Sequence, residues 1–206
     1  MRKKSHVYLA QFIADQVEWE ELKAHRKAFL LGSILPDCVP SFLTRRHTID
    51  ECFELMMSLM DDIYDTRKHN RAQMRRLCRN LGQVTHYVAD FFTYPHNKEY
   101  PGSMKQHCHY ENWQKLAIRK YLRSEEAQYD RAEVMEFDST ESIGAYIREL
   151  HAKYSGEERG VDHDISYIVQ INVQIVEALI NLFIFEKGID IPSESDKIST
   201  VANVCV

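Results

Sequence analysis

Glycine and proline are scarce in this sequence, which contains 7 glycines and 5 prolines among 206 residues. No stretch has the alternating apolar and polar pattern of a half-buried strand. Apolar residues recur instead at three- and four-residue intervals along most of the chain. The sequence therefore predicts an all-α protein. We expect one domain, a multi-helix bundle over residues 1–188, and a C-terminal tail over residues 189–206.

Several common catalytic signatures are also missing. The glycine patterns of dinucleotide-binding and phosphate-binding loops do not occur, and neither does Gly-x-Ser-x-Gly or His-Glu-x-x-His. The formal net charge of −5 argues against a general nucleic-acid coat protein. We therefore expect no specific nucleic-acid partner.

The cysteines do not form a disulfide framework. There are 5 of them, an odd number, and no two are spaced as Cys-x-x-Cys. Such thiols suit a reducing compartment. The charged segment 1–4 is not followed by an uninterrupted apolar run of the kind found in signal peptides. The sequence thus predicts a cytoplasmic protein.

The most apolar segment is a predicted long helix at about residues 162–187. Gln170, Asn172 and Gln174 lie inside it, and polar groups of this kind are unfavourable in the hydrocarbon core of a bilayer. We predict that this segment is the central helix of the core. No transmembrane segment is expected.

What the sequence does contain is a concentration of metal-ligand residue types in residues 86–111. His86 precedes Asp90 by four residues, and His107 precedes Glu111 by four. On a helix, this spacing places an imidazole and a carboxylate on one face, one turn apart. A single such pair is more often a surface pair. Two pairs together with His96, in an aromatic and apolar setting, favour a site for zinc or a similar cation.

Pro95 lies between these two pairs. Because proline lacks an N–H and clashes with the preceding turn, it should end or kink the first helix and redirect His96. The segment therefore predicts two ligand-bearing helices joined by a ligand-bearing bend. His109 lies two residues from His107, so it should face away from the metal.

Further candidates lie earlier in the chain. Ser5 should cap a helix that runs to about Lys23, and His6 in its first turn reads by itself as a partly exposed histidine. Pro36 should push Leu35 out of helical geometry and leave Asp37 on a loop. An acidic residue that follows an apolar run between two prolines is poorly explained as a surface charge. His47 lies just before the next predicted helix, beginning near Ile49.

A basic stretch precedes His86, where Arg71, Arg75, Arg76 and Arg79 recur at about one-turn spacing. Most simply, they form a solvated helix face. The less favoured interpretation is a patch that attracts phosphorylated substrates or an anionic lipid surface.

The set Gly32–Asp37, His47, His86-x-x-x-Asp90, His96 and His107-x-x-x-Glu111 resembles the zinc-dependent phospholipase C family. Its all-helical scaffold is shared with the S1/P1-type nucleases. The resemblance implies two to three zinc ions. It places Asp37, His47, His86 and Asp90 in a first site, and His96, His107 and Glu111 in a second. A third site would combine Asp90 with His6 and the terminal amine. We expect this site to be weakly occupied, because it needs an ordered chain end that carries Arg2, Lys3 and Lys4.

The resemblance also implies an activity. The chain should be a zinc-dependent phosphodiester hydrolase in which metal-activated water attacks phosphorus, with Asp37 as the general base. The expected substrate is a phosphodiester, with a phospholipid as the candidate, since in this resemblance Glu111 favours the phospholipase branch over the nucleases. Cys38, Thr44 and Thr48 stand in the region where choline-cleaving members carry aromatic side chains, which leaves the headgroup open. The alternatives are a single-strand nuclease or nucleotidase on the same scaffold, and a metal-binding protein without turnover.

Overall fold

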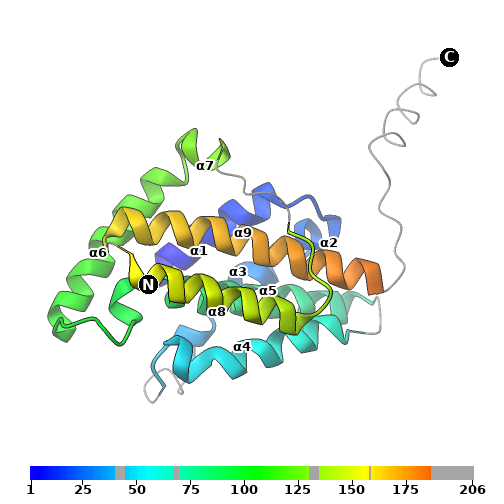
Figure 1. Cartoon of the computed structure of the whole chain (residues 1–206). Coiled ribbons are helices and arrows are strands. Elements are labelled where there is room, and N and C mark those ends of the chain that lie inside the picture. The colour runs from blue at the N-terminus through cyan, green and yellow to red at the C-terminus, as the bar shows by residue number, and fades with distance from the viewer. Residues whose placement is uncertain (40–44, 67–69, 130–134, 158, 187–206) are drawn as a thin grey trace.

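The computed structural model describes residues 1–39, 45–66, 70–129, 135–157 and 159–186 (Figure 1). Within these ranges the regular elements are helical and no strand occurs, so the all-α prediction is confirmed. The predicted boundary at residue 188 and the tail lie outside the described residues. The elements are α1 (Lys3–Gln16), α2 (Glu20–Ala24), α3 (Arg26–Gly32), the 3-10 turn η1 (Pro36–Cys38), α4 (Ile49–Tyr64), α5 (Arg71–Phe91), the 3-10 turn η3 (Tyr94–His96), α6 (Met104–Tyr121), α7 (Glu126–Tyr129), α8 (Thr140–Gly156) and α9 (Val161–Glu186).

Helix α9 runs through the middle of the bundle. It contacts α1, α4, α5, α6 and α8, and Figure 1 shows it crossing the molecule among them. By length and composition alone, α9 could span a membrane. However, 78% of its apolar window is buried inside the protein. The prediction of a central core helix is therefore confirmed for the described residues.

The N-terminal prediction was wrong in two respects. The first helix begins at Lys3, after Arg2 and without a side-chain cap, so Ser5 is buried inside the helix and does not cap it. It also ends at Gln16, because Val17 and Trp19 adopt extended backbone angles before α2 begins. Trp19 packs edge-on against Phe183 of α9. Tertiary packing thus interrupts a segment whose periodicity alone predicts one continuous helix.

The two ligand-bearing helices and the bend between them are present. Helix α5 starts behind Asn70, whose side chain accepts from the N–H of Gln73 at 3.0 Å, and it ends at Phe91. Pro95 lies in η3, after α5 has ended, which agrees with the expectation that proline cannot continue a helix. Helix α6 begins behind a capping box between Ser103 and Gln106, so His107 lies in its first turns.

The expected effect of Pro36 on Leu35 was wrong. Leu35 has helical backbone angles, with φ −60° and ψ −42°. Pro36 is the first residue of the 3-10 turn η1, a position where its fixed φ and missing N–H are tolerated. Asp37 consequently sits in a short ordered turn.

Candidate metal centre

The carboxylate of Asp90 is the centre of the first group of candidate ligands. Asp90 comes from α5 and is buried. Its Oδ2 lies 3.0 Å from Nδ1 of His47 and 3.2 Å from Nε2 of His86. The ligand atoms of these three residues all lie within 4.8 Å of one another, which is close enough for one ion to hold them. The structure thus brings together residues 43 positions apart in the chain.

Asp37 faces the same histidines from η1. Its Oδ1 lies 3.8 Å from His47 Nδ1 and 3.7 Å from His86 Nε2. Asp37, His86 and His6 form an overlapping group of possible ligands. Burial raises the pKa of Asp37 above its ordinary value, although nearby His86 opposes that shift. A raised pKa makes this carboxylate a stronger base than an exposed aspartate.

The second group lies on η3 and α6. Oε1 of Glu111 is 3.3 Å from Nε2 of His96 and 3.1 Å from Nε2 of His107. Burial opposes the ionisation of Glu111, but the neighbouring His107 and His96 hold its pKa below its usual range. His109 is exposed on the other side of α6, as the spacing predicts.

Backbone carbonyls orient two of these histidines. Nδ1–H of His86 donates to the carbonyl of Ser33 at 2.8 Å, and Nδ1–H of His96 donates to the carbonyl of His47 at 3.2 Å. A backbone carbonyl can only accept, so in each ring the Nε2 lone pair is left facing the carboxylates. Metal-ligating histidines are usually held in this way.

Two glycines set the position of the carbonyl that orients His86. A Cβ placed on Gly32 would lie 2.1 Å from the carbonyl oxygen of Arg79, and one on Gly82 would lie 2.1 Å from that of Phe29. Helices α3 and α5 therefore touch backbone to backbone. Because Gly32 precedes Ser33 and Gly82 lies one turn before His86, this approach allows the 2.8 Å hydrogen bond.

His6 is fully buried, contrary to the expectation for an isolated histidine. Its ring stacks on that of His86 with centroids 3.9 Å apart. Burial, with His86, lowers the pKa of His6 to about 3, so the ring is neutral. Neither ring nitrogen makes a well-aligned hydrogen bond among the described residues, although Nε2 lies 3.4 Å from Oδ1 of Asp90. A buried imidazole with a free lone pair beside Asp37 and Asp90 is the form in which histidine binds metal.

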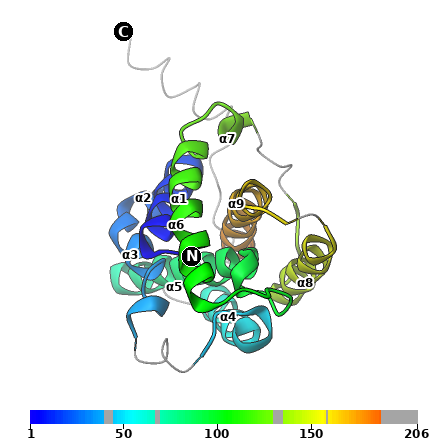
Figure 2. The same ribbon diagram turned by 90° about the vertical axis from the view of Figure 1, so that its left-hand side faces the viewer.

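The α-amine of Met1 lies between the two groups. It is 2.5 Å from Oδ1 of Asp90 and 3.2 Å from Oε1 of Glu111, and Figure 2 shows the N-terminus beside α6. Burial disfavours its charge, but Asp90 and Glu111 raise its pKa overall. Burial likewise opposes ionisation of Asp90, yet His96 and the amine hold the pKa of that carboxylate well below its usual range. The charged amine of Met1 therefore offsets part of the negative charge of Asp90 and Glu111.

The donor set fits zinc. It combines imidazoles with carboxylates, and the groups come from α1, η1, α5, η3, α6 and the segment just before α4. Every candidate named from the sequence lies in this centre. Its members are His6, Asp37, His47, His86, Asp90, His96, His107 and Glu111.

Asp164 is a buried residue of α9 that the sequence did not single out. Its Oδ2 accepts from the N–H of Tyr94 at 2.9 Å, the hydroxyl of Tyr110 at 2.8 Å and Nε2 of Gln114 at 3.3 Å. Its Oδ1 accepts from the hydroxyl of Tyr154 at 2.8 Å. Burial raises the pKa of Asp164 to about 6, although these donors oppose the shift. The carboxylate joins η3 and α6, the two elements that carry the second group.

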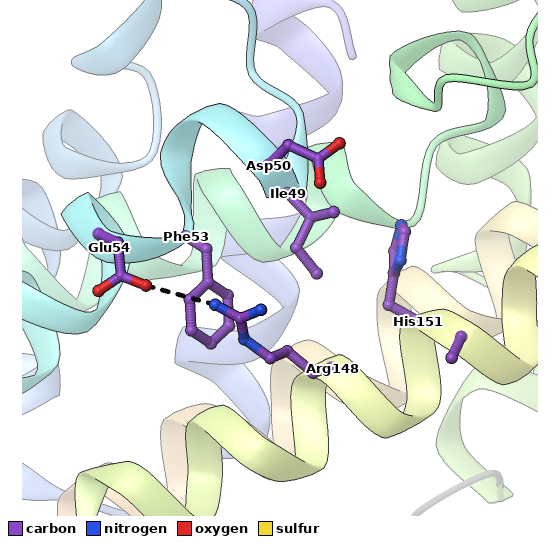
Figure 3. Close-up of a pocket in the computed structure, with 7 residues that line it drawn as sticks. Ile49, Asp50, Phe53, Glu54, Arg148 and His151 are labelled. Atoms are coloured by element: carbon purple, nitrogen blue, oxygen red, sulfur yellow. Dashed lines mark hydrogen bonds and ion pairs between the residues drawn. The ribbon is translucent and has the colours of Figure 1, made fainter.

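Two cavities border α4 and α8. One of about 290 Å³ lies between α4 and α8, where Arg148 covers the ring of Phe53 and pairs with Glu54 at 3.3 Å (Figure 3). A second, of about 210 Å³, shares Ile49, Asp50 and His151 with the first. It reaches His96 but no other residue of the two groups. Neither cavity is therefore the place where the candidate ligands converge.

Cys38, Cys52, Cys78 and Cys108 are free thiols, and Cys205 lies outside the described residues. This agrees with the expected absence of a disulfide framework in the described part of the chain. The cytoplasmic location itself stays a prediction.

In a comparison with protein families, the model of the zinc-dependent phospholipase C family matches residues 5–161. Comparisons with curated proteins and with solved structures gave no significant match. The matched segment includes all eight candidate ligands and ends just before Asp164.

Proposed function

Because this chain belongs to the zinc-dependent phospholipase C family, we propose that it is a zinc-dependent phosphodiester hydrolase of phospholipase C type. The observation that carries the proposal is the convergence of the two groups, His47–His86–Asp90 and His96–His107–Glu111. A phospholipid is the substrate that the family suggests.

The residues would divide the work between holding zinc and moving a proton. Asp37, His47, His86 and Asp90 would hold one ion, and His96, His107 and Glu111 a second. Zinc bound there would supply a water with its pKa lowered toward ~7 and would polarise phosphoryl oxygens. His6, Asp90 and the α-amine would form the third, weaker position.

Asp37 is the best candidate for the general base. Its pKa is raised, and it lies farther from the nitrogens of His47 and His86 than Asp90 does. One of its oxygens could therefore accept a proton while the other faces His47 and His86. Asp90, with its lowered pKa, would stay ionised and serve only as a ligand.

Two histidines on one helix provide a matched test. His107 belongs to the second group, whereas His109 is exposed two residues later. Elemental analysis of the protein purified with zinc should give at least two ions per chain. His107→Ala should lose one ion and most of the phosphodiesterase activity, and His109→Ala should match the unchanged protein.

The substrate panel should contain a short-chain phosphatidylcholine, a short-chain phosphatidylethanolamine and single-stranded DNA. Hydrolysis of a lipid in preference to DNA supports the proposal. Preference for DNA would replace it with the nuclease alternative. Full metal occupancy without any hydrolysis would point to a metal-binding protein, and fewer than one ion per chain would remove the metal centre.

A further inference from the structure

Helix α6 has a solvent-facing side opposite its metal-binding side. Glu111, Gln114 and Ile118 face the interior. The exposed side, which we call the α6 outer face, is formed by residues at successive intervals of four, four, three and four positions, so they share one side of the helix. They are Lys105, His109, Trp113, Leu116 and Lys120.

An exposed apolar pair lies near the middle of this face. Trp113 and Leu116 are one helical turn apart and each is 63% exposed. The chain has 2 tryptophans, and the other, Trp19, packs against Phe183. Neighbouring large apolar side chains left in water indicate a surface that something else covers.

The pair is flanked by positive charge. Helix α6 carries Lys105, Lys115, Arg119 and Lys120, and its single acidic residue, Glu111, is buried. The outer face therefore presents cations without an acidic residue, although the whole chain has a net charge of −5. Helix α1 packs against α6, and its first residues, Lys3 and Lys4, are also exposed.

We propose that the α6 outer face docks on an anionic lipid surface. Tryptophan and leucine favour the boundary between headgroups and acyl chains, and flanking lysines attract anionic headgroups. A symmetric contact with a second copy would oppose lysine to lysine. A nucleic acid would use the charges but would leave Leu116 exposed. This inference deepens the proposed function, on which it rests for the choice of lipid.

Binding can be measured without turnover. Vesicles of phosphatidylcholine alone and of phosphatidylcholine mixed with phosphatidylserine are incubated with the protein at low salt and sedimented. In a Trp19→Phe variant, Trp113 is the only tryptophan, so its fluorescence reports on this face. We expect sedimentation with the anionic vesicles and a blue shift of Trp113, both reversed by high salt.

A charge-matched pair of variants locates the surface. Lys105→Gln with Lys120→Gln should weaken vesicle binding by about thirtyfold, the effect expected for two basic residues near an anionic membrane. Arg75→Gln with Arg79→Gln removes the same charge from an exposed part of α5 and should have little effect. Circular dichroism checks that each variant is folded.

Equal effects of the two pairs, equal binding to uncharged vesicles or an unshifted Trp113 would each overturn the inference. Dimerisation abolished by Trp113→Ser would assign the face to a second copy, and tighter binding to DNA than to vesicles would assign it to nucleic acid. The proposed function fails separately, through lost hydrolysis of the short-chain lipids. Those lipids are soluble and need no docking.

Discussion

Replacing Asp164 tests whether the second group depends on a residue that binds no metal. Asp164→Ala leaves four buried donors without an acceptor: the N–H of Tyr94, Nε2 of Gln114 and the hydroxyls of Tyr110 and Tyr154. At ~1–2 kcal/mol for each, the free energy of unfolding should fall by roughly 6 kcal/mol. Removing the costly buried charge offsets part of this loss.

The pKa of Asp164 gives the size and the pH dependence of that offset. Burial raises it from 3.8 to about 6, so the folded protein holds this proton at a higher pH than the unfolded chain does. The stability contributed by this group is therefore complete below pH 3.8 and is lost as the pH rises through about 6. The charge costs about 3 kcal/mol at pH 7. Asp164→Ala should thus lose about 3 kcal/mol at pH 7 and about 4–5 near pH 5.

Metal binding distinguishes positioning from general stability. Asp164→Ala should weaken the binding of the ion at the second group by about 10–100-fold, as for other residues that orient metal ligands. The affinity for the ion at the first group should not change. Asp164→Asn should keep most of the affinity, because its oxygen can replace the Oδ2 that accepts three of the bonds. Titration of the metal-free variants with cobalt, followed by absorbance, measures the affinity for both ions.

The control lies on the same helix. Gln174 accepts one hydrogen bond from Tyr146 at 3.1 Å, and its replacement by alanine should lower stability without changing either ion. Unchanged affinity for both ions in a folded Asp164→Ala protein, or equal loss at both, would refute the positioning role.

Three further predictions concern other parts of the centre. Asp37→Asn should lower turnover by about 10²–10⁴ while metal content falls much less; proportionate losses would make Asp37 a plain ligand. Gly82→Ala should separate α3 from α5, lower the melting temperature and weaken the binding of the ion at the first group. Gly156→Ala should have none of these effects, because a Cβ added there would meet no atom of another part of the chain within 4 Å. Metal-free protein extended by a few residues before Met1 should melt earlier than protein that starts at Met1, because a charged amine beside Asp90 and Glu111 becomes a neutral amide. Both forms should still bind two ions, and loss of a tightly bound ion on extension would show that the amine is an essential ligand.

The local parts of the centre could be predicted from the sequence. The pairs His86–Asp90 and His107–Glu111 depend only on the four-residue spacing of a helix, and the bend at His96 depends on Pro95. Asp37 stands out by its position between two prolines, but the assignment of Asp37, His47 and His6 to the centre comes only from resemblance to a family, because their contacts join distant segments.

Local spacing in the sequence does not reveal Asp164. An acidic residue in the first turn of a helix is already explained by the helix dipole, so its position in α9 carries no sign of a buried role. Its partners come from η3, α6 and α8, and no spacing in the sequence brings these together. The break between α1 and α2 is similar, because it depends on where Trp19 meets Phe183.

The different chain separations within the two groups have a consequence for the order of folding. His96 and Glu111 are 15 residues apart, whereas His47 and Asp90 are 43 apart. Closing the longer loop costs about 1 kcal/mol more entropy, or about a fivefold lower chance of contact in the unfolded chain. The second group should therefore assemble earlier than the first, and the half of the centre that contains the proposed base should be the last to form.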